Sequence, residues 1–145
     1  MQDIDRHEYA RMKDFLSFYT ERYFNMEGLP PEDRPMAKLE AFEKKNLKKA
    51  FQGLRMTIND IVEDSFHFDP AKVEKLDSNL RSRGMITLSE LRRRYSKDYA
   101  KIMKRGQIRN ETEYYLLRNV LDDPTEKTPE ERELLAKLIS DYEGA

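Results

Sequence analysis

The chain has no cysteine and no tryptophan, and its glycines stand far apart, at Gly28, Gly53, Gly84, Gly106 and Gly144. The absence of cysteine excludes disulfide bonds and thiolate metal sites. Phosphate-binding loops need glycines close together, because only a backbone without side chains lets several N–H groups converge on one anion. Neither G-x-G-x-x-G nor G-x-x-x-x-G-K-[ST] occurs in the sequence. Nucleotide-binding α/β folds are therefore disfavoured.

Long apolar runs are also lacking. The sequence has no stretch of about 18 apolar residues, and a charged stretch follows Met1 where a signal peptide would have its apolar region. Charged residues make up 38% of the 145 residues, but 10% aromatic residues and regular apolar spacing argue against disorder. We expect a single domain over residues 1–145, located in the cytoplasm and without membrane contact.

Apolar residues recur at steps of three and four along most of the chain, which is typical of helices with one buried face. No stretch has the strict alternation of a β-strand. The spacing predicts an all-α fold, a compact bundle of five or six helices near 4–26, 36–66, 70–83, 88–105, 111–122 and 129–143. The long helix near 36–66 keeps its apolar phase across Gly53, although a break at that glycine is the alternative.

Three residue pairs have the spacing of a capping box, in which an N-cap side chain and a glutamate three residues later satisfy each other's backbone N–H groups. They are Thr87 with Glu90, Asn110 with Glu113, and Thr128 with Glu131. These pairs place the starts of the last three helices.

Charge is distributed very unevenly along the chain. Residues 81–109 contain ten basic and two acidic side chains, a net charge of +8, whereas residues 1–80 carry −3 and residues 110–145 carry −6. The net charge of −1 for the whole chain hides this polarity. One segment therefore concentrates the positive charge.

A helix over 88–105 would separate this charge from its apolar residues. Its apolar side chains fall within an arc of about 120°, and the opposite arc carries six cations: Arg93, Arg94, Lys97, Lys101, Lys104 and Arg105. Like charges at this spacing repel each other by a few tenths of a kcal/mol per pair. The cations therefore need compensating negative charge.

That charge has three candidate sources. Acidic residues of the flanking helices would make the basic surface purely structural. Phosphates of nucleic acid would make it a binding site, whose affinity falls with added salt. An acidic protein or a second copy of the chain is the third. A membrane surface is disfavoured, because the apolar arc lacks tryptophan and is needed for the core.

The stretch GMITLSELRRRYSKDYAKIMKRGQI, residues 84–108, resembles a helix-turn-helix in its rhythm. The resemblance implies a first helix over 88–94, a turn at Tyr95–Ser96 and a recognition helix over 97–105. Arg92 departs from the pattern, because such motifs commonly have a small residue there. The unbroken apolar arc favours one continuous helix instead.

Catalytic and metal sites find little support. The only histidines are His7 and His67. No serine lies in a nucleophile-elbow pattern, and His67 with Asp69, or His7 with Asp3 and Glu8, would supply only part of a metal site. The acidic cluster of Asp60, Glu63 and Asp64 lacks the Glu-x-x-His motif of di-metal bundles. We expect no catalytic residue, no metal and no cofactor.

The first helix is rich in aromatic residues, at Phe15, Phe18, Tyr19, Tyr23 and Phe24. Burial between neighbouring helices explains them most simply, and a dimer interface is the alternative, because aromatic residues are enriched at interface cores.

The sequence thus predicts a non-enzymatic binding or regulatory module. Its expected site is the basic surface of Arg93, Arg94, Lys97, Lys101, Lys104 and Arg105, which would recognise an acidic partner, with nucleic acid as the leading candidate. The alternative is a protein-interaction or homo-oligomer-forming domain that uses the aromatic first helix.

Overall fold

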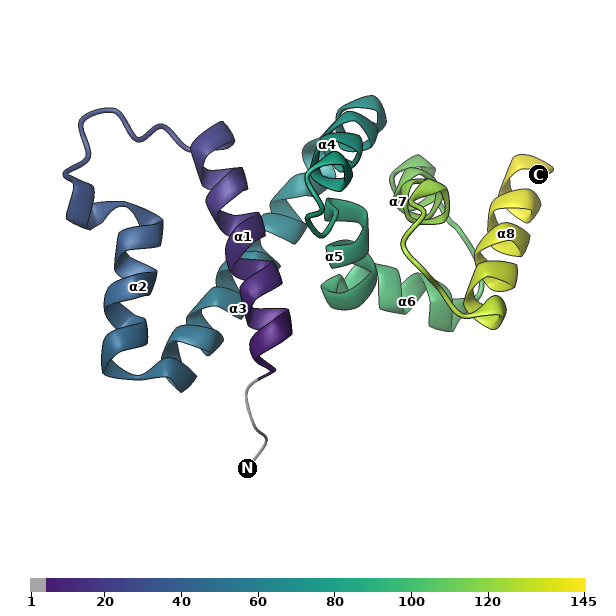
Figure 1. Cartoon of the computed structure of the whole chain (residues 1–145). Coiled ribbons are helices and arrows are strands. Elements are labelled where there is room, and N and C mark those ends of the chain that lie inside the picture. The colour runs from purple at the N-terminus through teal and green to yellow at the C-terminus, as the bar shows by residue number, and fades with distance from the viewer. Residues whose placement is uncertain (1–4) are drawn as a thin grey trace. The chain divides into compact units, whose positions relative to one another are not determined.

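The computed structural model describes residues 5–145, and every regular element in this range is helical (Figure 1). The elements are α1 (Arg6–Tyr23), the 3-10 turn η1 (Pro31–Asp33), α2 (Pro35–Lys45), α3 (Leu47–Asp64), the 3-10 turn η2 (Ser65–His67), α4 (Pro70–Ser82), α5 (Leu88–Tyr95), α6 (Lys97–Arg105), α7 (Glu111–Asp122) and α8 (Pro129–Glu143). The predicted all-α class is confirmed. There are more helices than the five or six expected, because two predicted helices are each divided in two.

The first division corrects the long helix predicted near 36–66. The chain leaves the helical conformation at Asn46, where φ is −160° and ψ is 98°. The Asn46 side chain accepts a hydrogen bond from the backbone N–H of Lys49 at 3.1 Å, which caps the start of α3. Gly53, the predicted point of weakness, lies inside α3. The apolar phase that suggested one helix continues across the break and could not reveal it.

The second division separates α5 from α6 at Ser96, so one continuous helix over 88–105 is wrong. Ser96 has an extended backbone, and its hydroxyl accepts a hydrogen bond from the N–H of Tyr99 at 3.1 Å. The break falls within the turn that the helix-turn-helix resemblance implies. Only Ser96 lies between the two helices, however, whereas the turn of that motif has three or four residues.

Other helix ends follow local chemistry. α1 is capped by Asp5, whose carboxylate accepts from two backbone N–H groups, and it ends at Tyr23 rather than near residue 26. Residue 4, the predicted start of this helix, lies outside the described residues. Gly106 ends α6 with φ at 75°, a left-handed conformation that glycine adopts at little cost.

The chain forms two compact units, one up to Asp60 and the other from Ile61 to Ala145. The first unit contains α1, α2 and most of α3. In it, Tyr9 stacks on Phe51 with 5.8 Å between ring centroids and donates a 2.8 Å hydrogen bond to Glu43. That the chain behaves as one domain stays a prediction.

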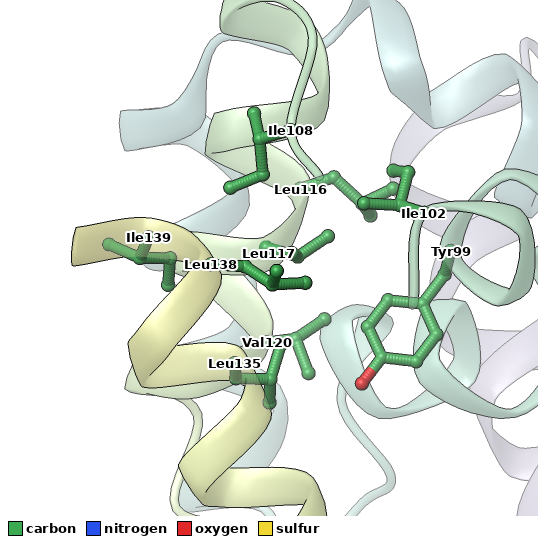
Figure 2. Close-up of a cluster of buried hydrophobic side chains, with 9 residues drawn as sticks. All are labelled: Tyr99, Ile102, Ile108, Leu116, Leu117, Val120, Leu135, Leu138 and Ile139. Carbon is green, nitrogen blue, oxygen red and sulfur yellow. The ribbon is translucent and has the colours of Figure 1, made fainter. Parts of the chain in front are cut away.

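The second unit contains a core built from α6, α7 and α8 (Figures 1 and 2). Its buried members are Tyr99, Ile102, Ile108, Leu116, Leu117, Val120, Leu135, Leu138 and Ile139. Tyr99 and Ile102 come from α6 and point into this cluster (Figure 2). The apolar side of α6 is therefore committed to the core, and the opposite side of the helix is left to solvent.

Candidate functional site

The solvent side of α6 carries Lys97, Lys101 and Lys104, and all three side chains are exposed. Residues at positions i, i+4 and i+7 lie on one face of an α-helix. Within residues 5–145, none of the three ammonium groups takes part in a salt bridge or hydrogen bond. We call Lys97, Lys101 and Lys104 the α6 lysine face.

The arginines of the predicted site have different surroundings. Arg93 and Arg94 both donate hydrogen bonds to Glu90, at 2.7–3.0 Å. The side chain of Glu90 is only 1% exposed. Burial by itself would raise the pKa of Glu90, but the hydrogen bonds from the two arginines outweigh it and lower the pKa below its ordinary value. Glu90 therefore stays ionised and neutralises the surface next to it.

Glu131 brings a second carboxylate to this network from α8. One of its oxygens accepts a 2.8 Å hydrogen bond from Nη1 of Arg93, and the other accepts one from the Tyr99 hydroxyl, also at 2.8 Å. Glu131 thus links α8 to both α5 and α6. Arg93 is held by two carboxylates and is the least available of the six predicted cations.

Arg105 is held at the other end of α6. Its guanidinium contacts the Glu113 carboxylate and donates to the backbone oxygen of Gln107 at 2.7 and 3.0 Å. The interpretation in which acidic residues of flanking helices neutralise the basic surface therefore describes Arg93 and Arg105, while Arg94 is paired with Glu90 of its own helix. It does not describe the α6 lysine face.

The neutralising carboxylates are the glutamates of the predicted capping boxes. In each box the N-cap side chain does accept from the backbone N–H three residues later. The reciprocal bond to the N-cap N–H is not formed within residues 5–145, because the side chains of Glu90 and Glu131 turn to arginines. The Glu113 carboxylate contacts Arg105 and accepts a 2.8 Å hydrogen bond from the backbone N–H of Arg109, one residue before the N-cap. The capping prediction is right for the N-cap residue and wrong for the glutamate. Arginines close in sequence to Glu90 and Glu113 were a signal for two of these pairs, whereas the pair of Glu131 with Arg93, 38 residues away, leaves no local signal.

Arg92 does not belong to the basic surface, although it lies in the same run of arginines. It is 3% exposed and donates from Nε and Nη2 to the hydroxyl and the backbone oxygen of Ser65, at 3.0 and 2.7 Å. Its guanidinium also lies over the ring of Phe66, 5.2 Å from the centroid. A helix-turn-helix has a small residue at this position, whereas here the arginine is buried against η2.

The aromatic first helix is mostly covered within the single chain. Tyr9, Phe15, Phe18 and Tyr19 are buried, Tyr23 is half-buried, and Phe24 is 44% exposed. Burial thus accounts for most of the aromatic residues that suggested a dimer interface.

The metal-site candidates gain no support from their surroundings. Within residues 5–145, no group of three or more histidine, aspartate or glutamate side chains is placed to hold a metal ion. His67 is exposed beside Phe66 and Phe68. Asp3, the third member of the group around His7, lies outside the described residues.

No helix within residues 5–145 has both the length and the apolar character needed to cross a membrane. Comparison of the chain with protein-family models, curated proteins and solved structures finds no match.

Proposed function

We propose that the chain is a binding module that holds the phosphate backbone of nucleic acid through Lys97, Lys101 and Lys104. The observation that carries the proposal is that these three exposed cations share one helix face and have no carboxylate partner among residues 5–145. Unpaired like charges at this spacing repel each other, and a polyanion relieves that repulsion while releasing its counterions.

The residue types on this face favour contacts with phosphates over contacts with base edges. From Lys97 to Lys104 the helix rises by about 10 Å, and an α-helix fits the major groove of B-DNA, which is about 12 Å wide. Lysine is a mobile point charge without the planar fork with which arginine reads guanine. The three arginines of the predicted site are held by Glu90, Glu131 and Glu113. We therefore propose binding with little sequence preference.

The experiment is a salt titration of binding to duplex DNA and to single-stranded RNA, followed by fluorescence anisotropy. Three phosphate contacts on DNA give a slope of log K against log salt near −2.7, whereas contacts by all six predicted cations give about −5.4. The titration thus separates the α6 lysine face from the wider surface that the sequence predicted. A wild-type chain that ignores both polymers at about 50 mM salt contradicts the proposal.

The variant is Lys97→Glu with Lys101→Glu, which we expect to abolish binding and leave the thermal midpoint nearly unchanged. The matched control is Lys75→Glu with Lys137→Glu, two exposed lysines of the same unit that lie on α4 and α8. Both double variants change the net charge equally, so equal losses of affinity would mean that only total charge matters. If the chain binds an acidic protein but neither DNA nor RNA, the α6 lysine face is a protein-binding site and the nucleic-acid proposal is wrong.

A second candidate, self-association, rests on the first unit. Phe24 and Phe42 are 44% and 54% exposed there, and both line a cavity of about 420 Å3 between α1, α2 and α3. Aromatic side chains at the rim of an apolar cavity suit an interface core. Sedimentation equilibrium at about 100 µM tests this, with Phe24→Ser and Phe42→Ser as variants that should dissociate a dimer. A wild-type monomer at that concentration rules it out.

A further inference from the structure

A cavity of about 160 Å3 opens in the second unit between η2, the start of α4, α5 and α7. Its lining combines the rings of Phe66 and Phe68 with the polar side chains of Arg92, Asn119, Thr112 and Glu111. Cavities of about 150 Å3 accept a benzene-sized molecule. The size therefore suits a small ligand with a compact apolar body.

Two buried polar side chains in the lining retain unused hydrogen-bonding groups. Arg92 is 3% exposed and uses Nε and Nη2 on Ser65, so that Nη1 forms no hydrogen bond within residues 5–145. Asn119 is 9% exposed, and its side-chain amide forms none either. No fully buried side-chain nitrogen or oxygen in the described chain lacks a partner. Nη1 and the amide must therefore be open to solvent, and the cavity is the opening that both side chains line.

The charge at this position is also incompletely balanced. Burial lowers the pKa of Arg92 to about 10, and the nearby carboxylate of Asp77 offsets part of that effect. The guanidinium therefore remains charged at neutral pH. The two carboxylate oxygens of Asp77 accept hydrogen bonds from the backbone N–H and the hydroxyl of Ser89, and not from Arg92. A buried charge without a directly bonded counter-ion is costly, and an anion in the cavity would reduce that cost.

We propose that this cavity binds a small monocarboxylate, with Nη1 of Arg92 and the amide of Asn119 holding the carboxylate and the rings of Phe66 and Phe68 contacting its apolar body. A guanidinium N–H and an amide N–H are the donors that a carboxylate accepts. The single buried cation and the exposed Glu111 in the lining disfavour a phosphate dianion. The site is separate from the α6 lysine face and does not depend on it.

The ligand chemistry could come from a free acid or from the terminal carboxylate of a peptide, and the probes distinguish the two. Benzoate is the free acid, and acetyl-Ala-Phe with a free or amidated terminus is the peptide. Binding is followed by the NMR shifts of the Asn119 side-chain amide. We expect a Kd of about 1 mM for benzoate and no binding of benzamide. A peptide acid that binds more tightly than benzoate would assign the site to chain termini.

Two variants test the geometry. Asn119→Ala removes one donor that forms no hydrogen bond within residues 5–145, and should weaken benzoate binding about tenfold. For this variant, binding is followed by calorimetry. Thr112→Trp places a bulky side chain at an exposed lining position and should block the cavity with Arg92 and Asn119 in place.

Asn59→Ala, on the exposed surface of α3, is the control for the asparagine change. The Lys97→Glu, Lys101→Glu variant should bind benzoate normally, so that failure of this proposal and failure of the nucleic-acid proposal are read separately.

Several results overturn the proposal. One is the absence of any benzoate-induced shift at about 20 mM, well above the expected Kd. Another is equal binding of benzoate and phenylphosphonate, which would leave a non-selective anion site. The third is unchanged benzoate affinity in both Asn119→Ala and Thr112→Trp, which would place the ligand elsewhere.

Discussion

Two neighbouring helices share one basic run of sequence but use their cations in opposite ways. The arginines of α5 are tied to carboxylates or to backbone oxygen, whereas the lysines of α6 extend into solvent without a partner among residues 5–145. Residue type accounts for part of this difference. A guanidinium has several donors in a fixed plane and loses less water on burial than an ammonium, so it is the better group for a fixed network. The comparison separates charge that holds the fold together from charge that is available to a partner.

The largest test of this comparison is Glu90→Ala, which removes the carboxylate that both Arg93 and Arg94 contact. We expect the free energy of unfolding to fall by about 3 kcal/mol, the lower end of the range for a broken buried ion pair, because both arginines retain some contact with solvent. Chemical denaturation measures the change. Glu133→Ala, an exposed residue of α8, is the control and should stay within about 0.5 kcal/mol of the wild type. A loss below about 1 kcal/mol for Glu90→Ala would show that the network is not structural.

Asp77→Asn tests the environment of Arg92, the arginine of α5 that does not contact Glu90. Burial raises the pKa of Asp77 to about 6, while hydrogen bonds from Ser89 and the charge of Arg92 oppose the rise and the charge of Asp123 adds to it. The folded state therefore binds a proton that the unfolded state has lost between pH of about 4 and 6, so that stability falls as pH rises through this window.

The measurement is the free energy of unfolding of wild type and Asp77→Asn from pH 4 to 7. Relative to the variant, the wild type should lose on the order of 2 kcal/mol over this range. The difference between the two curves isolates Asp77 from the other carboxylates. Parallel curves would mean that Asp77 keeps an ordinary pKa in the folded chain.

Arg105 is the intermediate case, an arginine of α6 that is 23% exposed and paired with a single carboxylate. Arg105→Ala should cost about 0.5–1 kcal/mol, as is typical of a partly exposed ion pair. A double-mutant cycle with Glu113→Ala isolates the pair, and added salt should reduce its coupling energy. A coupling energy near zero would show that the pair with Glu113 does not stabilise the fold, so that Arg105 would be available to a partner like the lysines of α6.

Lys101→Ala should have the smallest effect on stability. Its side chain has no partner among the described residues, and its loss relieves repulsion from Lys97 and Lys104. We expect the free energy of unfolding to stay within about 0.5 kcal/mol of the wild type, with a small gain at low salt. A loss above about 1 kcal/mol would show that the lysine has a structural role.

The sequence by itself determined that the chain is helical, where most helices begin, and which segment carries the positive charge. These features are local. The three- and four-residue spacing sets the buried face of each helix, and Asp69, Thr87, Asn110 and Thr128 cap helix starts in the structure as their residue types predict. Asn46 and Ser96 also have the residue types of N-caps, but an apolar phase that continues across both of them hid the two breaks.

Only the tertiary structure decided which cations are free. Besides Glu90 on its own helix, Arg93 pairs with Glu131, 38 residues away, and Arg105 pairs with Glu113, 8 residues away. Arg92 is buried against Ser65, 27 residues away. A helical wheel places all the cations of one helix on an outward surface, because it contains no information about what packs beside that helix. Packing between helices brought Glu131 to Arg93 and Glu113 to Arg105, whereas the pairs with Glu90 form within α5. Packing left Lys97, Lys101 and Lys104 without a partner among residues 5–145, and this selection defines the candidate site.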